Sequence, residues 1–334
     1  MNFKKSEGLI FGIYPGSGVG LETGLGRIKG KKDDAISIKA ALENLSGDKP
    51  FLVRSYIQYI GSGKSKNKTP QNFEYFCKEN IKLDLAICYR TNEHNMKDWR
   101  NFIKTTITEY KNVLAKIQIT EEPNNPDTNS GGDGSSLYIK EAIIEGVLAA
   151  KETITELGLD IQNGFNAVIS FNPQDTFWRD FAKLNTVEFT QALDYIGLDF
   201  YPDVFRPLPP NLTLKDAVIG VIQHYRNNNL PEGGIPNNLP LHITENGWPT
   251  NKERSEEKQA IVVQHLIETI FEIRKRNNIT HYEFFNLRDI DSSGKLAQAQ
   301  LESSGNNFQF GLMRDDYIPK PSYTIYKNLI NQMS

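Results

Sequence analysis

The segments Ile119-Thr120-Glu121-Glu122-Pro123-Asn124 and Ile243-Thr244-Glu245-Asn246-Gly247-Trp248 share one pattern. In each, a short run that contains β-branched residues is followed by a glutamate and then by loop-forming residues. β-Branched residues favour strands, so each segment predicts a strand whose C-terminal end carries a carboxyl group. If both strands belong to one parallel sheet, Glu122 and Glu245 lie at the same edge of that sheet.

Short apolar runs alternate with helical patterns along the whole chain, and this alternation predicts a parallel sheet. We expect strands over residues 9–14, 51–56, 83–88, 113–120, 162–170, 195–201, 241–244 and 282–286. We expect helices over residues 32–45, 70–80, 96–110, 135–157, 174–191, 213–228, 255–276 and 321–332. Eight β-then-α units make a (β/α)8 TIM barrel. A doubly wound open sheet is the alternative, and it predicts no special relation between the ends of the fourth and seventh strands.

Helix boundaries carry local signals of their own. Thr69-Pro70 fits a capping residue followed by proline at the first helical position, and Ser255 precedes two acidic residues in the same way. Gly158 stands where a helix is expected to stop. No linker rich in Pro, Gly or Ser divides the 334 residues, so we expect one domain over residues 1–334.

Composition narrows the class of protein. Apolar residues make up 38% of the chain and charged residues 24%, which is typical of a globular protein. The net charge of −3 argues against nucleic-acid binding, and the basic stretch over residues 64–68 predicts a solvated loop. No apolar run is long enough for a membrane span or a signal peptide, so we expect a cytoplasmic protein. Cys77 and Cys88 predict two reduced thiols, and no Cys/His cluster indicates a metal site.

Two carboxyl groups held across a bond are the minimal equipment for hydrolysing a glycoside. One of them donates a proton to the leaving oxygen, so it must be neutral at working pH because of burial or a nearby negative charge. In a retaining enzyme the other attacks the anomeric carbon and must stay ionised. Glu122 and Glu245 meet the first of these requirements by position only, since both lie on the predicted active face of the barrel.

Several short sequence segments, and their order along the chain, resemble the clan A glycoside hydrolases. Residues 120–124, Thr-Glu-Glu-Pro-Asn, resemble that clan's Asn-Glu-Pro-Asn, and residues 243–247 resemble its nucleophile segment. Residues 52–54 resemble the end of its second strand, and residues 196–201 its sixth strand. Residues 310–314 and 319–323 are similar to its closing segment. The resemblance spans the whole predicted barrel.

The resemblance implies a retaining β-glycosidase that uses no cofactor and takes a carbohydrate substrate. Glu122 is then the general acid/base and Glu245 the nucleophile. Arg54 keeps Glu245 ionised, and Tyr201 orients it and releases it during the reaction. Asp199 shares a strand face with Tyr201 and is expected near the site. Asn124 and Asn286 are further candidates for substrate binding.

Two positions depart from the clan's pattern. Glu121 stands where the clan has an asparagine that holds the sugar's 2-hydroxyl, and a carboxylate cannot donate as an amide does. This change predicts either a different substrate group at C2, such as an amine, or weakened catalysis. Phe285 and Asn286 stand where a tryptophan often forms the floor of the sugar site. A catalytically inactive, carbohydrate-binding barrel therefore remains the alternative function.

Sugar-binding sites also need flat apolar rings. Trp248, directly after the nucleophile segment, is the first stacking candidate, and Trp178 with Phe177 is the second. His242 precedes Glu245 by three residues on a strand, so alternation predicts that it faces the helices rather than the barrel interior. The sequence does not give the sugar, the linkage or the oligomeric state.

Overall fold

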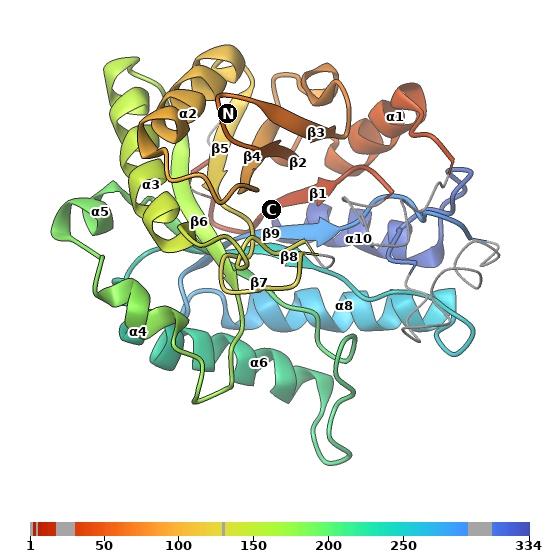
Figure 1. The fold of residues 1–334 in the computed structure, drawn as a ribbon. Coiled ribbons are helices and arrows are strands. Elements are labelled where there is room, and N and C mark those ends of the chain that lie inside the picture. Colours follow the sequence, from red (N-terminus) through yellow and green to blue (C-terminus); the bar gives the residue numbers. More distant parts are fainter. Residues whose placement is uncertain (1–2, 5, 18–30, 129–130, 293–308) are drawn as a thin grey trace.

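The computed structural model describes residues 3–4, 6–17, 31–128, 131–292 and 309–334. Eight parallel strands form a closed barrel (Figure 1). They are β1 (Ile10–Tyr14), β2 (Phe51–Tyr59), β4 (Ile81–Tyr89), β5 (Leu114–Ile119), β6 (Gln162–Val168), β7 (Tyr195–Asp199), β8 (Leu241–Asn246) and β9 (Ile279–Phe285). Strand β1 pairs with both β2 and β9, which closes the ring. The predicted TIM barrel is confirmed, and the open sheet is excluded.

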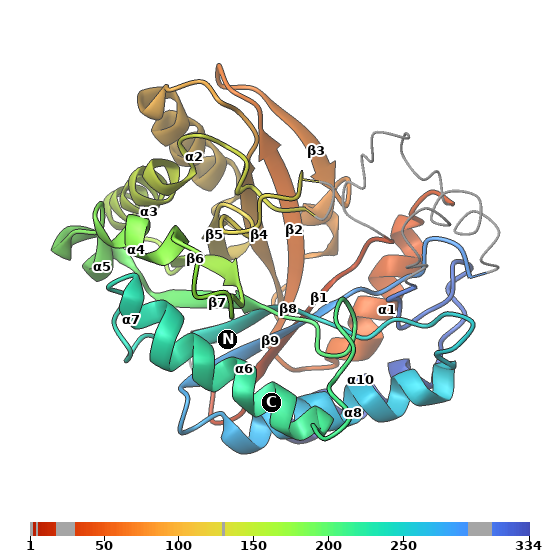
Figure 2. The ribbon, with the colours of Figure 1, turned by 60° about the horizontal axis from the view of Figure 1, so that its bottom comes forward.

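Helices cover the outside of the barrel, with α6, α8 and α10 lying along one side in Figure 2. The helices are α1 (Ala35–Ser46), α2 (Met96–Tyr110), α3 (Ile139–Glu156), α4 (Phe177–Ala182), α5 (Val187–Ala192), α6 (Leu214–His224), α7 (Leu230–Glu232), α8 (Glu256–Ile273) and α10 (Pro321–Met333). Apolar strand residues that face outward, such as Val53, Ile117 and Ile243, join the helices in one buried core. Within the described ranges, no helix is both long and apolar enough to cross a membrane.

The second β-then-α unit differs from the prediction. The expected helix over residues 70–80 is replaced by one short 3-10 turn, η1 (Phe73–Phe76). The basic stretch predicted as a loop belongs mostly to strand β3 (Ser65–Thr69), which pairs antiparallel with β2. Gly61 and Gly63, both with positive φ, make the tight turn of this hairpin. Thr69 does not cap a helix, since its hydroxyl bonds the Tyr14 hydroxyl at 2.6 Å.

Other helix boundaries are closer to the prediction. The Ser255 hydroxyl accepts from Lys258 N at 3.2 Å and caps α8, and Gly158 adopts φ 60° just past α3. The helix predicted over residues 174–191 is split into α4 and α5. The helix predicted over residues 213–228 ends as α6 at His224 and continues through a wide turn, η3 (Tyr225–Asn229).

The barrel interior contains ionisable groups as well as apolar ones. Lys116 on β5 lies between Asp84 on β4, at 3.1 Å, and Glu283 on β9, and all three side chains are fully buried. Burial and the neighbouring Asp84 raise the pKa of Glu283 to about 8, whereas Lys116 and Arg54 hold the pKa of Asp84 below its usual value against its own burial. One lysine therefore neutralises one carboxylate, and the second carboxyl group retains its proton.

This arrangement predicts a pH-dependent stability. Between the ordinary pKa of a glutamate and about pH 8, folded Glu283 holds a proton that the unfolded chain has released. The contribution of Glu283 to the free energy of unfolding is therefore fully present at low pH. It decreases as pH rises through that window, by up to about 1.4 kcal/mol per pH unit. Glu283→Gln is expected to flatten this decline in urea unfolding measured from pH 5 to 8. The exposed Glu272→Gln is the control, and an unchanged slope in Glu283→Gln would contradict the assignment.

Candidate active site

The turn after β5 presents two consecutive carboxyl groups at the C-terminal end of the barrel. Thr120 and Glu122 both adopt positive φ, 66° and 40°, which is unusual for residues with a Cβ. Buried side chains hold this backbone: Asp133 accepts from Glu121 N at 2.8 Å, and Asn166 on β6 accepts from Glu122 N at 2.9 Å. The strained turn is therefore fixed by its neighbours, and it directs the Glu121 and Glu122 side chains to one site.

A bulge in β8 brings Glu245 to the same site. Leu198 pairs with Ile243 and Asp199 pairs with Glu245, so Thr244 is an extra residue in this strand. The prediction that His242 faces the helices is wrong, because the bulge changes the alternation by one residue. His242 lies inside the barrel, with its ring stacked on Tyr195 at 4.1 Å and close to His281 at 3.7 Å.

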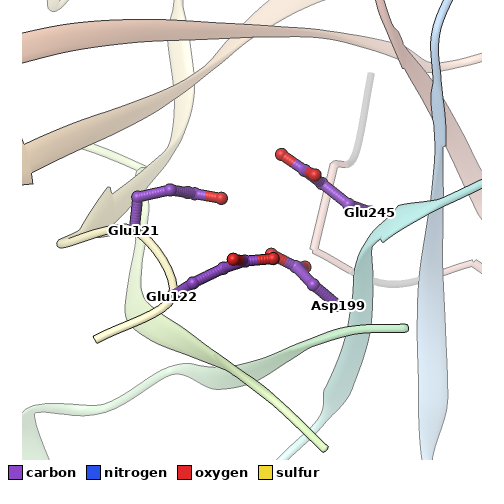
Figure 3. A group of neighbouring side chains, drawn as sticks. All are labelled: Glu121, Glu122, Asp199 and Glu245. Atoms are coloured by element: carbon purple, nitrogen blue, oxygen red, sulfur yellow. The ribbon is translucent and has the colours of Figure 1, made fainter. Parts of the chain in front are cut away.

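Four carboxyl groups converge above the barrel core (Figure 3). Glu121, Glu122, Asp199 and Glu245 each place one oxygen within 4.8 Å of the others, and all four residues are at least nine-tenths buried. In geometry these oxygens could surround a cation. Hydrogen bonds from protein groups already occupy each of the four side chains.

Glu245 receives a hydrogen bond on each carboxyl oxygen. The Tyr201 hydroxyl donates to Oε2 at 2.7 Å, and the Tyr56 hydroxyl donates to Oε1. The Arg54 Nε atom lies 3.5 Å from Oε1. These contacts hold the carboxyl group of Glu245 in one orientation.

Glu122 has a different environment. Its carboxyl group accepts from the Asn125 amide at 2.7 Å. Burial raises the pKa of Glu122 well above its usual value, and the nearby charges of Glu245 and Glu121 raise it further. Glu122 is therefore suited to hold a proton at neutral pH and to donate it.

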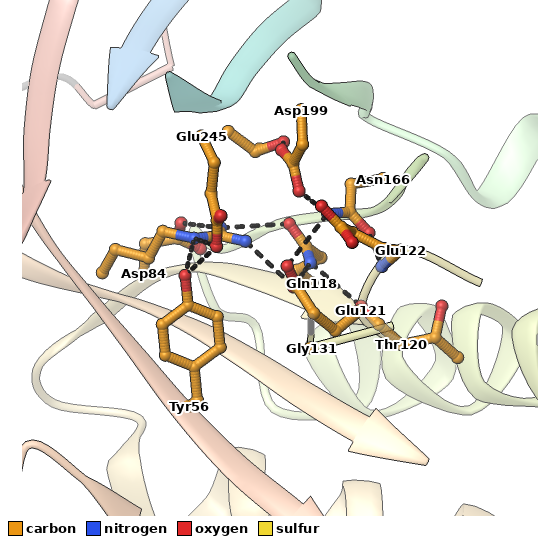
Figure 4. Close-up of polar contacts among 12 residues, drawn as sticks. Tyr56, Asp84, Gln118, Thr120, Glu121, Glu122, Gly131, Asn166, Asp199 and Glu245 are labelled. Atoms are coloured by element: carbon orange, nitrogen blue, oxygen red, sulfur yellow. Dashed lines mark hydrogen bonds and ion pairs between the residues drawn. The ribbon is translucent and has the colours of Figure 1, made fainter. Parts of the chain in front are cut away.

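The pKa values of Glu121 and Asp199 are also raised, chiefly by burial. Glu121 accepts from Arg54 Nη2 at 3.0 Å and from the Gln118 amide (Figure 4). Asp199 accepts from the Asn166 amide and from the Thr244 hydroxyl. These two carboxyl groups are bonded mainly within the protein, whereas Glu122 has few donors around it.

The remaining predicted residues lie outside this hydrogen-bonded cluster. The Asn124 side chain bonds both the N–H and the C=O of Val168 and ties the β5 turn to β6. Asn286 is buried just past β9, and its Oδ1 has no partner among the described residues.

Neither of the two predicted stacking residues, Trp178 and Trp248, has a ring face exposed for a sugar. Trp178 packs against Phe165 and Tyr225 in the core between β6 and its covering helices, and Trp248 is fully buried beside Arg254. The structure corrects both stacking predictions, because both rings belong to the buried core.

Sequence reasoning missed several members of the site. Tyr56 follows Arg54 by two residues and so shares its face of β2, a relation that strand alternation could have given. Gln118 and Asn166 are polar residues in otherwise buried strands, which is a second usable signal. Phe205 follows β7 and is 58% exposed, with its ring 5.5 Å from that of Tyr201. No pattern in its loop distinguishes it.

Comparisons with known proteins agree with this geometry at the level of the fold. No family model matches the chain, and no curated protein matches its sequence. Among solved structures, a family 1 β-glucosidase from Thermotoga maritima aligns over 98% of both chains with a TM-score of 0.60 and 12% identity. The chain shares the (β/α)8 barrel fold of this enzyme.

Two further structures are similar over part of their length. A GH2 β-galacturonidase from Eisenbergiella tayi bound to galacturonate gives a TM-score of 0.56 at 13% identity, with 88% of this chain covering 47% of the other. A β-glucuronidase from Ruminococcus gnavus, in complex with D-glucuronic acid, gives 0.59 at 14% identity, with 96% covering 48%. This chain thus spans about half the length of these two enzymes, and at such low identity the likeness shows the fold alone.

Proposed function

We propose that this protein is a retaining glycosidase that hydrolyses a β-linked glycoside by double displacement. The observation that carries the proposal is the pair Glu122 and Glu245, whose nearest oxygens lie within 4.8 Å at the C-terminal end of the barrel. Retaining enzymes hold their two carboxyl groups about 5–5.5 Å apart, and inverting enzymes hold them about 6.5–9.5 Å apart. The different surroundings of the two glutamates support the division of roles.

In the first step an oxygen of Glu245 bonds to the anomeric carbon while the bond from that carbon to the leaving oxygen breaks. The leaving oxygen takes the electron pair and receives the proton of Glu122. In the second step Glu122 removes a proton from water, the water oxygen bonds to the anomeric carbon, and Glu245 leaves as a carboxylate. The exposed ring of Phe205 beside Tyr201 provides an apolar face for the substrate.

The proposal is tested with activated 2-fluoro β-glycosides of glucose, galactose and glucuronic acid. An activated 5-fluoro β-glycoside of 2-amino-2-deoxyglucose is added, because fluorine at C2 would replace the amino group. We expect the mass of the intact chain to rise by one glycosyl unit with at least one probe. Aryl β-glycosides of the same sugars should be hydrolysed with retention at the anomeric carbon, read by NMR. An inverted product would contradict the retaining mechanism.

The alternative is a carbohydrate-binding barrel without turnover, and one observation favours it. Glu121 occupies the position of the clan's sugar-binding asparagine and is engaged by Arg54 and Gln118. Binding of the unreactive sugars in calorimetry, with neither adduct nor hydrolysis from any probe, would establish this alternative.

A further inference from the structure

Tyr56 lies between Arg54 and Glu245. Its hydroxyl accepts from Arg54 Nε at 2.7 Å and donates to Glu245 Oε1 (Figure 4). The side chain is 1% exposed, and its ring packs edge-on against Tyr14 at 5.4 Å. The phenol is therefore held in place by packing as well as by its two hydrogen bonds.

Arg54 is engaged on every side. Its Nη1 donates to Asp84 at 3.0 Å and to Gln118 at 3.1 Å, and its Nη2 donates to Glu121 at 3.0 Å. The single proton on Nε is directed to the Tyr56 hydroxyl, so Nε stands 3.5 Å from Glu245 without a direct bond. Glu121 thus holds a guanidinium nitrogen that a neutral residue would bind more weakly.

We propose that Tyr56 is a positioning residue for the nucleophile Glu245. Its hydroxyl accepts from Arg54 and donates to Glu245, while Glu121 and Asp84 accept from the other guanidinium nitrogens. This inference rests on the proposed function. It assigns different tasks to the two oxygens of Glu245. Oε2, bonded to the partly exposed Tyr201, is the oxygen that attacks the anomeric carbon. Oε1 stays bonded to the buried Tyr56 through both steps.

The surroundings of Tyr56 suit a permanent donor. Burial raises the pKa of Tyr56 well above its usual value, and the charges of Glu245 and Glu121 raise it further, against the opposing effect of Arg54. The hydroxyl therefore keeps its proton throughout the pH range in which a glycosidase acts. As Glu245 leaves in the second step, negative charge returns to its oxygens, and the bond from Tyr56 strengthens.

The first test compares Tyr56→Phe with Tyr59→Phe on the aryl β-glycoside that the wild-type protein hydrolyses fastest. Tyr59 lies on the same strand, and its hydroxyl bonds Asp98 at 2.5 Å, outside the barrel. A hydrogen bond to a charged group predicts a loss of about 10- to 100-fold in kcat for Tyr56→Phe with little change in KM. Tyr59→Phe is expected to keep wild-type kinetics, and thermal melting shows whether each variant folds.

The second test asks whether Tyr56 compensates for Glu121. Glu121→Asn frees Arg54 Nη2, so the guanidinium can turn toward Glu245. In this background Tyr56→Phe is expected to cost several-fold less in kcat than in the wild type, a coupling that a purely structural role does not produce.

The outcomes separate the two proposals. If the wild type turns over substrate, three results would overturn the role of Tyr56 and leave the proposed function standing. The first is an equal loss of activity in Tyr56→Phe and Tyr59→Phe, and the second is an effect of Tyr56→Phe on KM only. The third is that the effects of Tyr56→Phe and Glu121→Asn are additive. Absence of turnover and of labelling in the wild type would overturn the proposed function, and the role of Tyr56 with it.

Discussion

Glu245→Gln is expected to abolish both hydrolysis and covalent labelling. The amide has nearly the shape of the carboxylate, and its one oxygen can still accept from one of the two tyrosine hydroxyls, but it cannot form the glycosyl ester. We expect kcat/KM to fall by about 10⁴-fold or more, which corresponds to at least about 5 kcal/mol of lost transition-state stabilisation. The measurement is steady-state hydrolysis together with the intact mass after incubation with a 2-fluoro β-glycoside.

The matched control for this variant is Glu253→Gln, an exposed glutamate in the loop after β8. It should retain both activity and labelling. A Glu245→Gln protein that still acquires the sugar adduct would show that another group is the nucleophile. Glu121 and Asp199 are then the first residues to examine, because both place an oxygen within 4.8 Å of Glu245.

Glu122→Gln is expected to slow the reaction according to the leaving group. A lost general acid costs about 10²- to 10⁴-fold, and we expect this loss in kcat/KM with alkyl glycosides. A nitrophenyl glycoside needs no proton to leave and should lose far less in the first step. Added azide needs no general base, so it should restore the second step and yield a β-glycosyl azide, which chromatography and mass spectrometry detect.

The same variant tests the pKa of Glu122. Because burial and the neighbouring carboxylates raise this pKa, the wild type should keep its proton donor at neutral pH and lose activity as rising pH removes the proton. Glu122→Gln should lack this alkaline decline in kcat/KM. An alkaline limb that persists unchanged in the variant would assign the titration to a different group.

Much of this molecule follows from local sequence patterns. The eight barrel strands were predictable because each is a short, mostly apolar run between helices or turns. Glu122, Glu245 and Tyr201 lie at or just past strand ends as expected, whereas Arg54 lies within β2, which extends to Tyr59. The predictions that were wrong concerned residues whose positions depend on tertiary packing. Trp248 and Trp178 were assigned to the cleft by sequence proximity, yet the burial of large rings places them in the core.

Other features depend on distances that no local pattern encodes. Strand β3 pairs with β2 where a loop was expected, because two glycines allow the tight turn of a hairpin. The hydrogen bonds of Arg54 to Asp84, Glu121 and Tyr56 join two strands and a turn that are separated in the chain. Alternation could place Tyr56 on the correct face, but its contact with Glu245 required the closed barrel.

The bulge in β8 makes the nucleophile depend on the number of residues in a strand as well as on their identity. Inserting one residue after Thr244 would leave every residue of the site in the chain, yet the inserted residue would take the position opposite Asp199 and the glutamate would turn toward the helices. A search for related chains that compares residue types alone would accept such a sequence as complete. The number of residues between Ile243 and the glutamate distinguishes a barrel whose glutamate faces the site from one whose glutamate is present in the sequence but faces the helices.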